Sequence, residues 1–293
     1  MDFKKNSSLL FLIISMSVFG TIGIFVKYIP LPSGFIAMSR GFIGALFLFL
    51  VMLVGGKKPD LGAIRKNLLL LITSGALIGF NWILLFEAYN YTSVATATLC
   101  YYAAPIFVII VSPVFLREKI TLKKLICVTI SVIGMVMVSG TPASAGGKKE
   151  YIGIILGLGA AMLYASVIIL NKKLRDISAY DKTSIQLLSA AVVLVPYTLL
   201  VEELSREAFS PLAVIMLLVV GIVHTGVAYA MYFGSMEGLR AQTVALFSYI
   251  DPVVAIILSA VILNENIGAW GYIGAALVLG STFVSELPER KND

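Results

Sequence analysis

The chain of 293 residues is 59% hydrophobic and only 13% charged, whereas a soluble globular domain carries about 25% charged residues. A soluble protein of this length cannot cover so much apolar surface, so the composition indicates an integral membrane protein. The formal net charge of +6 does not indicate a nucleic-acid partner, because the basic residues lie in short loops beside apolar segments. No cofactor or metal is expected, since the sequence contains no HExxH, CxxC or GxxxxGK[ST] motif.

Ten apolar segments each approach the roughly 20 residues that a helix needs to cross a bilayer. The first segment is longer than the apolar part of a signal peptide and has no small-residue cleavage site after it, so an uncleaved first helix is expected. The predicted spans are 9–27, 34–54, 67–89, 94–115, 121–139, 151–170, 184–201, 211–233, 243–262 and 268–285. The expected fold class is an all-α membrane protein with ten transmembrane helices.

The distribution of basic residues predicts how these helices are oriented. If the N-terminus is cytoplasmic, most of the 22 Lys and Arg residues fall in loops on the cytoplasmic side. Only Lys27, Lys148, Lys149 and Arg206 fall in outer loops, and Arg40 lies within a span. We therefore expect a multi-pass protein of the plasma (cell inner) membrane with both termini in the cytoplasm.

An internal repeat relates the fourth span to the ninth. The segment Thr96–Glu118 recurs 147 residues later as Thr243–Glu265, with ten of 23 positions identical and no gap. The repeating unit is therefore five helices, and because five is odd the second unit crosses the membrane in the opposite sense. This predicts two inverted five-helix repeats, residues 1–145 and 146–293. Such repeats place a substrate site near the bilayer midplane and favour alternating access.

A family pattern runs through nearly the whole chain. It comprises the first-span motif FGTIGIFVK, Arg40 in the second span, and a Pro…Glu…Gly pattern that occurs twice: Pro105, Glu118 and Gly134, then Pro252, Glu265 and Gly274. In these residues the chain resembles the EamA-type carriers of the drug/metabolite transporter superfamily. The resemblance implies ten helices and a carrier without ATPase machinery. Known members mostly move amino acids, related metabolites or drug-like compounds, many of them outward.

Ionisable groups within spans are candidate functional groups, because each costs about 2.5–3.5 kcal/mol at the bilayer centre on insertion scales. Arg40 could hold a substrate carboxylate, or instead pair with a buried acid or helix carbonyls. Asp251 precedes Pro252, which loosens the helix, and could bind an ammonium group or a proton, or instead pair with Arg40. Glu87, His224 and Asp251 are candidates for proton coupling; the alternatives are an interfacial role for Glu87 and a core role for His224.

Polar aromatic residues occupy equivalent positions in the two repeats. Trp82 corresponds to Tyr229, and Tyr102 corresponds to Tyr249. Such pairs could stack on a planar substrate or bind an amine through cation–π contacts; the alternative is an interfacial aromatic belt. Nearby polar side chains add hydrogen-bonding groups. The complete predicted substrate site is Arg40, Asn81, Trp82, Tyr101, Tyr102, Tyr229, Ser248, Tyr249 and Asp251.

These features together favour a secondary transporter of small polar metabolites, namely amino acids or related amines, and not an enzyme. The alternatives are a carrier of lipid or lipid-linked substrates, a drug exporter or a channel. An intramembrane protease is a remote alternative, since the spans lack the paired Ser and His or the two Asp residues that it needs. The expected partners are a small-molecule substrate and the lipid bilayer. A homodimer is left open, because spans 121–139 and 268–285 carry few polar groups.

Overall fold

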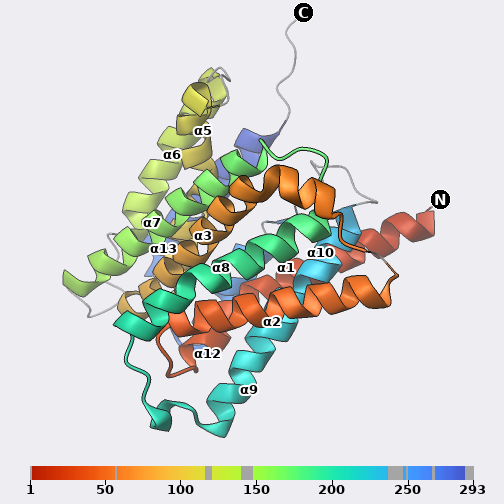
Figure 1. The fold of residues 1–293 in the computed structure, drawn as a ribbon. Coiled ribbons are helices and arrows are strands. Elements are labelled where there is room, and N and C mark those ends of the chain that lie inside the picture. Colours follow the sequence, from red (N-terminus) through yellow and green to blue (C-terminus); the bar gives the residue numbers. More distant parts are fainter. Residues whose placement is uncertain are drawn as a thin grey trace, which may run out of the picture.

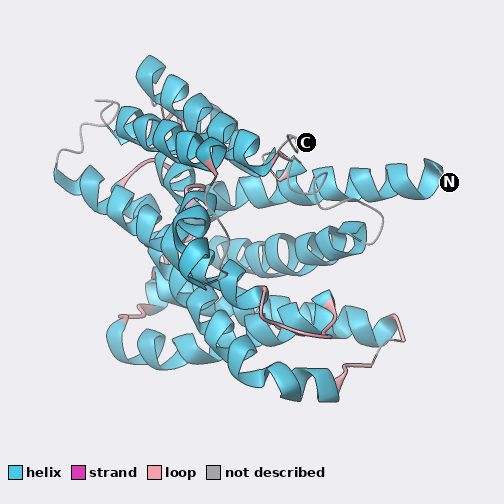
Figure 2. Cartoon of the chain, turned by 90° about the horizontal axis from the view of Figure 1, so that it is seen from above, coloured by secondary structure: helices cyan, strands magenta, loops and turns pink. Residues whose placement is uncertain are grey.

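The protein is a bundle of helices, seen from two directions in Figures 1 and 2. The computed structural model describes residues 2–56, 58–115, 121–139, 148–236, 247–248, 250–265 and 268–287, and no strand occurs within these ranges. The first helices are α1 (Asp2–Lys27), α2 (Ser33–Val54), α3 (Leu61–Tyr91), α4 (Val94–Tyr101), α5 (Ala104–Phe115), α6 (Leu122–Ser139) and α7 (Lys148–Asn171). They are followed by α8 (Ala179–Val201), α9 (Pro211–Val219), η2 (Val220–Val227), α10 (Ala228–Met236), α12 (Ile250–Ile262) and α13 (Gly268–Glu286).

Seven helical stretches in the described part of the chain are long and apolar enough to cross a membrane. Their bounds are Ser7–Lys27, Ser33–Val54, Leu61–Tyr91, Val94–Val111, Glu150–Asn171, Ala179–Val201 and Pro211–Tyr232. Shorter apolar helices cover Leu125–Gly134, Ile250–Ile262 and Gly268–Ser281. The predicted all-α membrane fold is therefore confirmed, while the number of ten spans stays a prediction. The predicted boundary between the two repeats, near residue 145, lies outside the described residues.

Polar residues placed just before apolar runs begin several of the helices. The Asp60 carboxylate accepts a hydrogen bond from the backbone N–H three residues on and so caps α3. Ser93 and Ser178 do the same for α4 and α8, and Ser210, followed by Pro211, does so for α9. Each cap satisfies one of the backbone N–H groups that the first turn of a helix leaves without a partner.

The predicted fourth span differs from the structure, because it is not one continuous helix. Helix α4 ends at Tyr101, and α5 begins at Ala104 after a turn. In that turn the N–H of Ala103 donates to the Cys100 carbonyl over 3.1 Å, a separation of three residues instead of four. Pro105 has no N–H for the carbonyl of Tyr101, so the α-helical ladder cannot run through this point. At Pro105 one helix has therefore ended and another has begun.

The predicted eighth span also contains an irregularity, the π-helical segment η2 between α9 and α10. A Cβ at Gly221 would lie 2.7 Å from Cβ of Ile43, and one at Gly226 would lie 2.6 Å from the ring of Phe47. Both neighbours belong to α2, so the glycines allow the backbone of η2 to approach α2 closely. This close approach brings Thr225 of η2 against Arg40 of α2.

Pairs of neighbouring helices follow a pattern that relates the first five predicted spans to the last five. Helix α3 packs on α7 and α8, α2 packs on η2 and α8, and α1 packs on α10 and α12. When each span is exchanged with the span five positions away, the α3–α7 contact becomes the α10–α1 contact. The α3–α8 contact likewise becomes the η2–α2 contact. Figure 1 shows α2, α8 and α3 lying side by side.

Helices α6 and α13 pack mainly on one another. The hydroxyl groups of Ser131 and Ser281 lie 2.5 Å apart in a hydrogen bond between them. A Cβ at Gly134 would lie 2.7 Å from the carbonyl oxygen of Gly274, so the backbones nearly touch. This close approach is typical of small residues at helix interfaces in membranes.

Candidate functional site

A cavity of about 340 Å³ lies between helices of both predicted repeats. This volume is within the range of roughly 300–1,000 Å³ that small-molecule sites usually have. Eight of the nine residues of the predicted substrate site line it: Arg40, Asn81, Trp82, Tyr101, Tyr102, Tyr229, Ser248 and Asp251. The ninth, Tyr249, lies outside the described residues. Residues as far apart in the sequence as Arg40 and Asp251 therefore meet around one space.

Arg40 supplies the cation of this cavity and is held on two sides. Its side chain is 4% exposed, and its guanidinium carbon lies 4.1 Å from the ring centre of Trp82 and 5.4 Å from that of Phe86. Its Nε donates a hydrogen bond to Oγ1 of Thr225 over 3.1 Å. Within the described residues no carboxylate lies within 4.0 Å of this guanidinium. Arg40 is therefore a buried cation whose charge is not neutralised by a neighbouring acid.

Asp251 supplies the acid, at the start of α12. Its carboxylate is hydrogen-bonded to the hydroxyl of Tyr102. Helix α1 passes close by, since a Cβ at Gly20 would lie 2.5 Å from the carbonyl oxygen of Asp251. The alternative of a structural ion pair between Asp251 and Arg40 does not occur in this conformation. Both charges thus face the cavity without neutralising each other.

Aromatic side chains form much of the cavity wall. The ring of Tyr101 lies 5.4 Å from that of Tyr164, and the ring of Phe19 lies 5.1 Å from that of Tyr229 and 6.3 Å from that of Tyr232. Tyr164, Phe19 and Tyr232 were not among the predicted site residues. Phe19 and Tyr164 are 145 positions apart and align in the repeat, so that alignment was the signal that could have found them. The edge-to-face and tilted arrangements are those that aromatic pairs prefer.

Asn81 lies at the cavity but has a partner in the neighbouring helix. Its side-chain amide donates a hydrogen bond of 2.5 Å to the carbonyl oxygen of Ala160 in α7, and it is 1% exposed. A buried side-chain amide needs such a partner, because an unsatisfied one costs about 1–3 kcal/mol. Asn81 therefore joins α3 to α7 beside the site.

The comparison with known proteins follows from this architecture. Two stretches, residues 6–140 and 151–286, each match the family described as "EamA-like transporter family". The chain belongs to the EamA-like transporter family. It is a membrane transporter and not an enzyme.

This EamA-like transporter is similar in sequence to several curated proteins. "Uncharacterized transporter YxxF" of Bacillus subtilis (strain 168) is 28% identical over 279 residues, which cover 94% of this chain and 88% of that protein. "Protein RarD" of Escherichia coli (strain K12) is 24% identical over 206 residues, covering 70% and 67%. A solved crystal structure superposes with a TM-score of 0.68 at 15% identity over 96% of each chain, which is a likeness in fold alone.

Two predicted coupling residues of this EamA-like transporter do not line the cavity. Glu87 accepts hydrogen bonds from the hydroxyl of Ser33 (2.9 Å) and the amide of Asn90 (3.2 Å) near the end of α3. His224 is 1% exposed in η2, with Nε2 2.7 Å from the hydroxyl of Thr21 and Nδ1 3.3 Å from a backbone carbonyl. The structure therefore separates them from Asp251, the one coupling candidate that faces the cavity.

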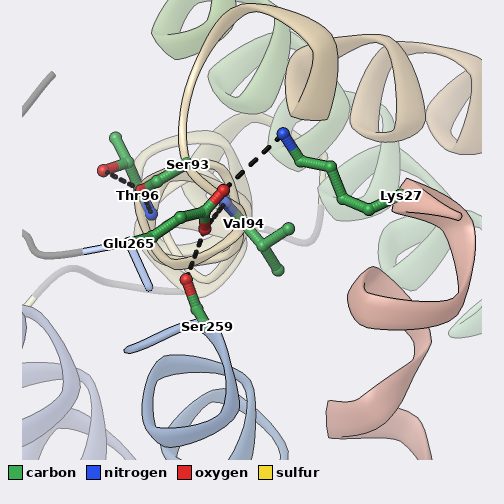
Figure 3. Close-up of polar contacts among 6 residues, drawn as sticks. All are labelled: Lys27, Ser93, Val94, Thr96, Ser259 and Glu265. Carbon is green, nitrogen blue, oxygen red and sulfur yellow. Dashed lines mark hydrogen bonds and ion pairs between the residues drawn. The ribbon is translucent and has the colours of Figure 1, made fainter. Parts of the chain in front are cut away.

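Beyond one end of the cavity, a carboxylate joins three of its helices (Figure 3). Glu265, just after α12, accepts hydrogen bonds from the backbone N–H of Val94 (2.8 Å) and the hydroxyl of Ser259 (2.5 Å). Its Oε1 also lies 3.6 Å from Nζ of Lys27 at the end of α1. We name Lys27, Val94, Ser259 and Glu265 the clasp. The clasp joins the C-terminal ends of α1 and α12 to the N-terminal end of α4.

A second carboxylate of the EamA-like transporter caps a helix from outside it. Pro32 precedes α2 and offers no side-chain cap. Instead both oxygens of Glu202, just after α8, accept hydrogen bonds from the backbone N–H groups of Gly34 (2.7 Å) and Phe35 (2.8 Å). Burial raises the pKa of Glu202, and the two N–H donors oppose this by stabilising the carboxylate. Glu202 thereby ties α8 to the start of α2.

Proposed function

We propose that this transporter carries small polar metabolites, amino acids or related amines, by alternating access and without ATP. The observation that supports this is the presence of one cation and one acid, Arg40 and Asp251, in a single aromatic cavity where they do not pair. A ligand with a carboxylate and an ammonium group would neutralise both. Burying either charge alone is unfavourable, so a zwitterion matches the cavity better than an uncharged or singly charged compound.

In this proposal the carboxylate binds the guanidinium of Arg40, whose planar donors suit a carboxylate. The ammonium group binds Asp251, and the tyrosine rings around it contribute cation–π contacts. The predicted site residues Asn81, Ser248 and Tyr249 belong to the same proposed site. The aromatic wall favours a ligand with an apolar or planar part over a small, fully polar one.

The proposed topology is ten transmembrane helices in two inverted repeats, residues 1–145 and 146–293, with both termini cytoplasmic. The exchange pattern of neighbouring helices supports it, since contacts such as α3–α7 and α10–α1 correspond. The bias of Lys and Arg toward one side of the predicted spans supports the orientation. We propose the plasma (cell inner) membrane as its location.

The test is counterflow in liposomes that contain the purified protein and unlabelled amino acids. Labelled amino acids, added outside in small pools, are expected to accumulate in exchange with at least one pool. Arg40→Gln should abolish this uptake; the segment around Gln186 corresponds to the segment around Arg40 in the other repeat, so a glutamine is compatible with such a helix. Arg40→Lys should retain part of it, because the charge remains but the planar fork is lost.

Thr198→Val serves as a matched control for these variants. Thr198 is fully buried in α8, its hydroxyl has no hydrogen-bond partner among the described residues, and it does not line the cavity. The control should transport as the wild type does. Wild-type protein that is folded in the membrane but exchanges no amino-acid pool would overturn the proposed substrate class and favour drug-like or lipid-linked substrates.

A further inference from the structure

We propose that Thr225 is the positioning residue that aims the guanidinium of Arg40 into the cavity. Thr225 is 0% exposed and does not itself line the cavity. Its Oγ1 accepts the hydrogen bond from Nε of Arg40 over 3.1 Å. The inference rests on the proposed function in one respect, namely that the cavity binds a carboxylate.

The π-helical segment η2 determines which way this hydroxyl points. Oγ1 of Thr225 donates its own hydrogen to the carbonyl oxygen of Val220, five residues earlier, over 3.0 Å. Because a hydroxyl has one hydrogen, that bond leaves only lone pairs for Arg40, and Thr225 must act as the acceptor. The five-residue separation is the register of a π-helix, a conformation often found at functional sites.

Two further contacts complete the orientation of the guanidinium. Its central carbon lies over the ring of Trp82 at 4.1 Å from the ring centre, and over the ring of Phe86 at 5.4 Å. With one face on Trp82 and the Nε edge on Thr225, the edge that remains carries the two terminal NH2 groups. No carboxylate of the described residues occupies that edge. It is the edge that binds a carboxylate through two parallel hydrogen bonds.

Thr225 should therefore control the selectivity of the transporter for substrates with a carboxylate, and not only the stability of the fold. Without the hydroxyl, Arg40 keeps its charge but loses the contact that fixes its rotation. We expect Thr225→Val to raise KM about tenfold for the transported amino acid, the size expected for losing one hydrogen bond to a charged group. The KM for the amide of that amino acid, which has no carboxylate, should stay within about twofold of the wild type.

Tryptophan fluorescence tests the position of the Arg40 guanidinium without any ligand. The chain has two tryptophans, and Trp270 is 66% exposed in α13, away from the cavity. In a Trp270→Phe background, emission comes from Trp82 alone, against which the guanidinium lies. Thr225→Val should shift that emission, because the cation no longer sits at a fixed place over the indole. Thr225→Ser, which retains the hydroxyl, should restore both the emission and the KM.

The control is Thr198→Val, which makes the same change at a buried threonine whose hydroxyl bonds to nothing in the part of the chain that the structure describes. It should leave the emission and both KM values unchanged. If Thr225→Val fails to fold, Thr225→Ala replaces it in both arms. An unchanged Trp82 emission together with an unchanged ratio of acid to amide KM would overturn the inference. Absence of transport in the wild type would instead count against the proposed function, and the emission would still decide the role of Thr225.

Discussion

Nζ of Lys27 lies 3.6 Å from Oε1 of Glu265, and this ion pair connects the end of α1 to the end of α12. Both helices line the cavity, through residues such as Gly20 and Asp251. The same carboxylate also holds the first backbone N–H of α4. An ion pair at a water-exposed position contributes little, but a carboxylate with three partners on three elements is an effective connection.

We predict that the clasp must open during transport. Cysteines placed at 27 and 265 and joined by a short bifunctional thiol reagent should abolish counterflow, because α1 and α12 could then no longer separate. The native Cys100 and Cys127 are both buried and would be replaced by serine for the experiment. The same double variant without reagent, and the Lys27→Cys single variant with it, are the controls. Full counterflow by the cross-linked protein would show that this end stays closed throughout.

The second prediction concerns Asp251 as the group that couples transport to protons. An asparagine at this position cannot release a proton but can still accept the hydrogen bond from Tyr102. Asp251→Asn should therefore lower transport, because the substrate ammonium group loses its counter-charge, and the transport that remains should no longer depend on pH while the protein stays folded. Counterflow and net uptake would be measured from mildly acidic to mildly alkaline pH. A variant with the pH profile of the wild type would exclude Asp251 as the coupling group.

Substituting Gly20 should separate α1 from α12. A Cβ there would lie 2.5 Å from the carbonyl oxygen of Asp251 and 2.7 Å from Cβ of Val254, and neither atom is the end of a flexible chain. We expect Gly20→Ala to lower the thermal midpoint of unfolding in detergent, with a loss of about 1–3 kcal/mol typical of overpacking.

Gly280→Ala provides the matched comparison for that variant. Gly280 is helical in α13, and a Cβ there would meet no described atom within 4 Å outside its own helix backbone and chain neighbours. Alanine should stabilise this helix by up to about 1 kcal/mol relative to glycine. Equal effects of the two substitutions would mean that the Gly20 contact does not constrain the bundle.

Removing the cap at the start of α2 is the fourth test. Glu202→Ala leaves the N–H groups of Gly34 and Phe35 without an acceptor, so we expect a loss of about 1 kcal/mol and a lower unfolding midpoint. Glu203→Ala, at the exposed neighbouring residue, should have no effect. A cap role is refuted if both variants unfold at the same temperature.

Glu202 also makes a defined contribution to the pH dependence of stability. Burial raises its pKa above the ordinary value of 4.5, so the folded protein holds this proton more tightly than the unfolded chain does. Its contribution to stability is therefore fully present below the ordinary pKa and is lost as the pH rises through the raised pKa. Glu202→Gln should remove this component, which is measured by comparing unfolding midpoints of variant and wild type across that pH window.

Several parts of the site could be predicted from the sequence because the repeat aligns them. Arg40 and Asp251 stand out as rare charges in apolar spans, and both line the cavity. Trp82 and Tyr229, matched by the repeat, line it as well. The role of Thr225 could not be predicted from the sequence. The direction of its hydroxyl depends on the π-helical register of η2, and no residue pattern predicts that register.

The clasp was also beyond prediction, for a different reason. The sequence places Lys27 and Glu265 at the ends of separate predicted spans and within the family pattern, but it does not predict a contact between them. Their contact depends on how α1 packs against α12, which periodicity within a single helix does not determine. The break between Tyr101 and Ala104 was partly predictable, because Pro105 removes one backbone hydrogen bond of the helix there. Whether a helix bends or ends at such a point depends on the helices packed around it.

The contact between α6 and α13 has a consequence for how such a protein could move. Each helix comes from a different predicted repeat, and their contacts in the described chain are mostly with each other. Helices around the cavity can therefore change partners without disturbing the hydrogen bond between Ser131 and Ser281. The α6–α13 pair would then keep its contact unchanged while the two repeats rotate relative to each other about it.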